Sequence, residues 1–220
     1  FFPNRLCAKI TQEAFGPYIA AQMTSHLDTK TAIGIGKYFT AQFLAEVLLH
    51  VDVAKAGSLL AKWPLAHLKK VVLFLLAEQQ FEQMGGIVEH LPKDRILEVV
   101  KTIDSPLAVM QISHAVQHKM HLAEALIQLQ DEELQALIEA TNESGLWEAA
   151  LLTCSHLNAK QQLRVRKLSQ DFEWDDERVF HRVAEQLGIA DELSGLLGAQ
   201  QPKTSLAKLS RFLGGRRKTV

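Results

Sequence analysis

A repeat of 24 residues constrains the fold of this chain more than any other feature. Asp28 begins one copy and Asp52 begins the next, and Phe39 in the first copy matches Trp63 in the second. Each copy has the apolar spacing of two short helices joined by a tight turn. Because such a unit cannot bury its apolar face alone, copies of it must stack on one another.

The rest of the chain also has the composition and spacing of short helices. Its 220 residues are 47% hydrophobic and 22% charged, and they show little of the alternation that is typical of strands. We therefore predict an all-α fold, a right-handed superhelical array of short helix-turn-helix repeats of the armadillo or HEAT kind. Residues 1–202 are expected to form this helical-repeat solenoid, and residues 203–220 a basic C-terminal helix and tail.

Turn and capping residues predict several helix boundaries. Gly16-Pro17 should break the first helix, because proline in a helix interior costs roughly 3 kcal/mol. The other signals are N-caps, N1 prolines, a capping box and a glycine stop. In chain order they are Asp28, Asp52, Pro64, Ser105 with Pro106, Asn158 with Gln161, and Gly188.

Composition also limits the cellular setting. The longest apolar run, Val71 to Ala77, is far shorter than the about 20 residues that span a bilayer, so no transmembrane segment is expected. Cys7 and Cys154 match no metal or redox spacing, which favours free thiols and a cytoplasmic location. The chain opens with Phe1 and not Met, so we expect residues to precede it. A net charge of −1 gives no basic footprint for nucleic acid.

No motif for catalysis is present. The chain has no G-x-S-x-G and no H-E-x-x-H. The spacing of a phosphate-binding loop is absent from Gly34-Ile35-Gly36-Lys37. We expect these glycines instead to allow two helices to approach each other closely. We predict that the protein is not an enzyme; the alternative, a site assembled from distant residues, would require a deep pocket with convergent ionisable groups.

Two groups of residues resemble metal ligands. His114 and His118 are four apart, so on one continuous helix they would share a face, although surface histidines are the simpler interpretation. The second group puts five acids in seven residues, which would suit Mg²⁺ or Ca²⁺ or, more simply, form a solvated loop before a helix. Its members are Asp171, Glu173, Asp175, Asp176 and Glu177.

Two charged segments are candidates for binding a partner protein. The first is acidic, contains no Lys or Arg, and is either solvated or the receptor of a basic partner. It comprises Asp131, Glu132, Glu133, Glu139, Glu143 and Glu148. The second is the amphipathic end of the chain, which carries Arg211, Arg216 and Arg217 and either caps the solenoid or binds a partner.

The repeat also resembles a known family. Leu27-Asp28, Val51-Asp52, Trp63-Pro64 and the segment Glu89-His90-Leu91-Pro92-Lys93-Asp94 resemble the turn-plus-helix pattern of the cytoplasmic N-terminal superhelical domain of MgtE-type magnesium transporters. The resemblance implies armadillo-like packing in a stand-alone bacterial repeat protein. Because the first repeats here lack that domain's dense acid content, no ion-binding residue is carried over.

These observations give two functional hypotheses. The leading one is a non-catalytic helical-repeat scaffold that binds another protein and needs no cofactor. The alternative, implied by the resemblance, is a regulatory domain that responds to a divalent cation such as Mg²⁺.

Overall fold

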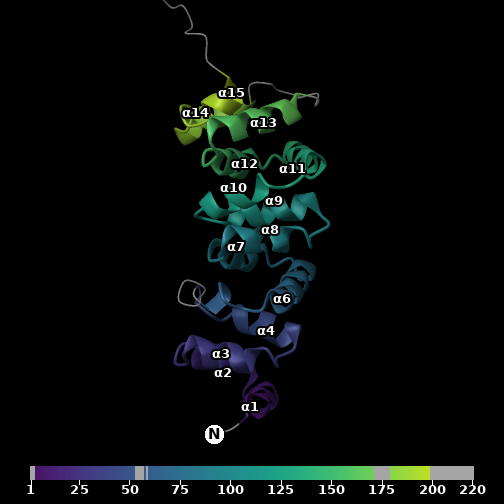
Figure 1. Ribbon diagram of the computed structural model, residues 1–220, viewed down its shortest axis with the longest axis vertical. Helices are drawn as coiled ribbons and strands as arrows, with labels where there is room; N and C mark the ends of the chain where they lie inside the picture. Colours follow the sequence, from purple (N-terminus) through teal and green to yellow (C-terminus); the bar gives the residue numbers. More distant parts are fainter. Residues whose placement is uncertain (1–2, 53–56, 58, 171–178, 199–220) are drawn as a thin grey trace, which may run out of the picture.

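A computed structural model describes residues 3–52, 57, 59–170 and 179–198, and all the regular structure in these ranges is helical. Figure 1 shows short helices following one another along the long axis of the molecule, from α1 at one end to α15 at the other. In chain order they are α1 (Asn4–Ile10), the π-helix η1 (Thr11–Phe15), α2 (Gly16–Thr24), α3 (Thr29–Gly36), α4 (Ala41–Leu48), α6 (Leu65–Ala77), α7 (Phe81–Glu89), α8 (Lys93–Val100), α9 (Pro106–Ala115), α10 (Met120–Leu126), α11 (Asp131–Ser144), α12 (Trp147–Cys154), α13 (Ala159–Ser169), α14 (Val179–Leu187) and α15 (Ser194–Leu197).

The predicted break in the first helix is present. Gly16 has φ of 75°, a left-handed conformation that suits glycine, and Pro17 follows it near the start of α2. The preceding turn, η1, widens to π geometry, a local distortion that commonly accompanies an interrupted helix. Gly16 and Pro17 therefore separate α1 and η1 from α2.

Most of the capping predictions are confirmed. Asp28 accepts a hydrogen bond from Thr31 N at the start of α3, and Ser105 accepts one from Ala108 N at the start of α9. Asn158 forms the expected capping box with Gln161. The N-cap predicted at Asp52 precedes residues 53–56, which lie outside the described part of the chain.

The prediction for Pro64 is wrong by one residue. Pro64 is the N-cap of α6 and not its N1 residue, because its own carbonyl accepts the first helical hydrogen bonds, from the N–H groups of His67 and Leu68. Thr40 is likewise the N-cap of α4, where its hydroxyl accepts from Phe43 N. The two residues thus occupy equivalent positions, 24 residues apart.

Most helices pack mainly against helices two positions away in the chain. The strongest packing pairs α2 with α4, α4 with α6, α7 with α9, α8 with α10, α9 with α11 and α13 with α15. Adjacent layers therefore join along the molecule, as the order of the helices in Figure 1 suggests.

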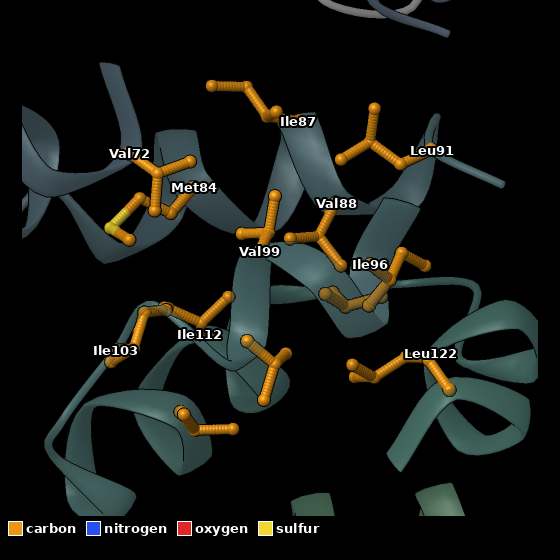
Figure 2. Close-up of a cluster of buried hydrophobic side chains, with 14 of the residues drawn as sticks. Val72, Met84, Ile87, Val88, Leu91, Ile96, Val99, Ile103, Ile112 and Leu122 are labelled. Atoms are coloured by element: carbon orange, nitrogen blue, oxygen red, sulfur yellow. The ribbon is translucent and has the colours of Figure 1, made fainter. Parts of the chain in front are cut away.

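The core runs through these layers. Figure 2 shows side chains of α6 to α10 gathered in one cluster, among them Ile87, Ile96 and Leu122. Trp63 is 5% exposed, and Phe39 is partly buried against the same core, so both aromatic residues of the repeat point inward. A Cβ added at Gly36 would lie 2.3 Å from a ring carbon of Trp63, so this glycine does permit the close approach that was expected.

Two further predictions can be compared with the described residues. Both cysteines are free, and burial raises the pKa of the Cys154 thiol to about 12, which keeps it protonated and unreactive at neutral pH. None of the described helices has both the length and the apolar character that crossing a bilayer requires.

Candidate functional site

The acidic segment that was predicted from the sequence forms most of α11. Glu132, Glu139 and Glu143 are all exposed and lie seven and then four residues apart, so a helix of 3.6 residues per turn places them on one face. Within the described residues none of the three forms an ion pair with Lys, Arg or His. We call these three residues the α11 acidic stripe.

Two other acids of this segment have structural roles. The Asp131 carboxylate accepts a hydrogen bond of 2.9 Å from Arg164 Nε, and the Glu133 carboxylate accepts one of 2.8 Å from Gln130 N in a capping box. Acids in the first turn also interact favourably with the positive end of the helix dipole. Asp131 and Glu133 are therefore engaged within the chain, whereas the carboxylates of the stripe form no ion pair among the described residues.

Arg164 was not singled out from the sequence, although it fixes one end of this surface. From α13 its guanidinium donates to the carbonyls of Ile127 and Leu129, at 2.6 and 2.8 Å, as well as to Asp131. It thus satisfies carbonyls at the end of α10 and holds the start of α11 against α13. Arg95 does the same from α8 for the carbonyls of Leu60 and Trp63.

His114 and His118, which the weaker of the two interpretations made a metal site, do not lie on one continuous helix. Helix α9 ends at Ala115 and Val116 is extended, so the two imidazoles do not share a helical face. His118 Nδ1 instead donates to the Glu89 carboxylate on α7. No group of three or more possible metal ligands occurs among the residues that the structure describes.

The side chain of Lys119 caps the end of α9 at Ala115. Its side chain is buried, and its Nζ donates to the carbonyl oxygens of Ser113 and Val116 at the end of the helix. Burial lowers the pKa of Lys119, and the negative charges of Glu148 and Glu89 partly oppose that shift. The ammonium is therefore used as a C-terminal helix cap, which is a favourable position for a cation.

The pKa of Glu89 is also shifted, by burial and by its contact with His118. Burial raises the pKa of its carboxyl, but the hydrogen bond and the charge of His118 lower it, and the net result is a pKa below the ordinary value. Since each group has a partner within the chain, we interpret the contacts of Glu89, His118 and Lys119 as structural.

The remaining candidates lie outside the described residues. These are the five acids between Asp171 and Glu177 and the basic residues Arg211, Arg216 and Arg217. The Mg²⁺ site and the basic tail stay predictions.

No protein-family model, curated protein or solved structure matches this chain. The site therefore has to be interpreted from its own geometry.

Proposed function

We propose that this protein is a non-catalytic scaffold that binds a basic segment of another protein along the α11 acidic stripe. The observation that carries the proposal is the stripe itself, in which Glu132, Glu139 and Glu143 face solvent without a basic partner among the described residues. Three carboxylates on one face attract a basic segment, and their mutual repulsion falls when it binds.

We further propose that the helices form a superhelical array of the armadillo or HEAT kind, with the stripe on its concave side. Support comes from the packing of most helices against the helix two positions away and from the equivalent N-caps at Thr40 and Pro64. Arrays of this kind bind extended partners along a concave surface. The resemblance to the N-terminal domain of MgtE-type transporters is compatible with the same arrangement.

A pull-down comparison tests the function. The bait is the full chain as wild type and as the triple variant E132Q/E139Q/E143Q, which removes the charges and keeps the side-chain volumes. The control is E78Q/D104N/E185Q, three exposed acids outside α11. We expect a basic protein that is captured by the wild type and the control, is lost from the stripe variant, and is released as salt rises.

Recovery of the same proteins by the stripe variant and the wild type would refute the stripe as the binding surface. The cation-responsive alternative rests on residues 171–177, which lie outside the described ranges, and millimolar Mg²⁺ in a thermal-shift experiment tests it separately.

A further inference from the structure

The N-terminal helices enclose an apolar cavity of about 280 Å³. Its wall is formed by α1, η1, α2, α3, α4, the residues around Trp63 and the start of α6, and none of the described lining residues is charged. The polar groups of the described lining belong to Cys7, Thr11, Thr24 and the Trp63 indole, and the Thr24 hydroxyl is already bonded to the Ala20 carbonyl. The Trp63 Nε1 group is buried and has no hydrogen-bond partner among the described residues. Protein interiors rarely leave so large a space unfilled.

The side chains of α2 explain the space. The buried residues of this helix are Ala20 and Ala21, whereas Tyr18 and Ile19 are 61% and 44% exposed. From α2 the cavity is lined by Ala20, Met23 and Thr24, whereas Ala21 lines a neighbouring hollow. The small side chain of Ala20 leaves part of the space on this side unfilled.

A more polar hollow of about 370 Å³ adjoins the cavity. The two share five lining residues, which are Thr24, Leu27, Ala32, Val51 and Leu59. The outer hollow adds Gln22, Ser25, Thr29, His50 and Asp52. The apolar cavity thus lies directly against a hollow that offers hydrogen-bonding groups, which we call the mouth.

We propose that this region binds a neutral single-chain amphiphile, with its hydrocarbon part in the cavity and its polar end in the mouth. A dry apolar cavity of about 150 Å³ accepts benzene, so the larger space here suits a chain of about ten carbon atoms. A charged group inside would lose its hydration without gaining a partner. A carboxylate in the mouth would also lie near Asp52, so an uncharged hydroxyl or amide end fits best.

The test uses the full chain and the neutral fluorescent probe N-phenyl-1-naphthylamine. We expect saturable probe binding that 1-decanol reverses. Sodium decanoate at pH 8 has the same chain length with a charged end. At least about tenfold more decanoate than 1-decanol should be required for the same displacement of the probe, equivalent to about 1.4 kcal/mol. Absence of saturable binding, or equal displacement by the two ligands, would overturn the proposal.

A variant locates the site. Ala32 is buried and lines both the cavity and the mouth. The A32F variant should lower probe affinity at least about tenfold, because the added ring would fill the space where the two meet. The matched control is A150F, beside a separate apolar pocket of about 90 Å³. Probe binding to a folded A32F that equals the wild type would place the ligand elsewhere.

A second, milder change covers the case in which A32F does not fold, as judged by circular dichroism. V47I adds one methylene to the cavity wall. It should weaken 1-decanol about threefold while leaving the helical signal intact. Unchanged or tighter binding of 1-decanol to V47I would count against the cavity.

Discussion

The N-terminal region (residues 4–51) and the middle region (residues 65–129) use the same short capped helices but fill space differently. In the middle region Leu75, Leu91 and Ile96 are fully buried. Figure 2 shows Leu91 and Ile96 within a cluster of buried apolar side chains. In the N-terminal region the buried residues of α2 are alanines, and a cavity remains. Caps and turns thus set the path of the chain, whereas side-chain volume decides whether the interior closes.

Matched truncations should give the largest difference between the regions. Leu122→Ala in the middle region should lower the free energy of unfolding by about 3–5 kcal/mol, because Leu122 is buried among close neighbours. Leu48→Ala at the cavity wall should cost only about 2–3 kcal/mol, since Leu48 already faces empty space and loses fewer contacts. Urea denaturation measures both values, and equal losses would show that the cavity is not empty in solution.

Replacing a valine by isoleucine should have opposite effects on stability in the two regions. Val99→Ile adds a methylene where Val99 is 1% exposed in a filled core, and should cost about 1–3 kcal/mol. Val47→Ile adds the same group at the cavity wall, and should stabilise by up to about 0.8 kcal/mol. Thermal and urea unfolding of the two variants provide the measurement. Destabilisation by both would mean that the two regions are packed alike.

Outside the N-terminal region, two arginines cap helix ends that lie far away in the sequence, and they differ in how many partners they hold. Arg164→Met removes donors from two carbonyls and from the Asp131 carboxylate, and should cost about 2 kcal/mol. Arg95→Met leaves only the carbonyls of Leu60 and Trp63 without their donor, and should cost about 1 kcal/mol. The ranking is checked by chemical denaturation at two salt concentrations. A larger loss for Arg95→Met would contradict it.

The smallest expected effect is the pH dependence of stability that comes from Glu89 in the middle region. The folded-state pKa of Glu89 is below its ordinary value of 4.5, so the ionised carboxylate stabilises the fold above that value. This contribution is lost as pH falls through the lowered pKa. Glu89→Gln should therefore cost about 1 kcal/mol at pH 7, and the difference from wild type should shrink in acid. Unfolding curves between pH 7 and pH 3 test this, with Glu78→Gln as the control for an exposed carboxylate. A difference that is constant with pH would contradict the role of Glu89.

The parts of this fold that were predictable from sequence are those determined by neighbouring residues. Gly16-Pro17, Asp28, Ser105 and the capping box at Asn158 act within four residues of themselves, and their roles were confirmed. The all-α class follows from the same local preferences.

The site was less predictable, because its decisive contacts join distant residues. Arg164 reaches carbonyls 35 and 37 positions earlier, and no local pattern marks it. Lys119 ends α9 early, which placed His118 beside Glu89 and not beside His114. The cavity depends on which residues of α2 face it, here Ala20, Met23 and Thr24, and the apolar spacing alone left that rotation open.

The pairing of most helices with one only two positions away has a mechanical consequence. Among the described residues, no strong packing joins the first helices to the last. Tension applied at the termini would detach the outer helices first and leave the inner ones in place. The chain should therefore lengthen in a series of small steps, and each step should reverse readily because it reforms only contacts near in sequence.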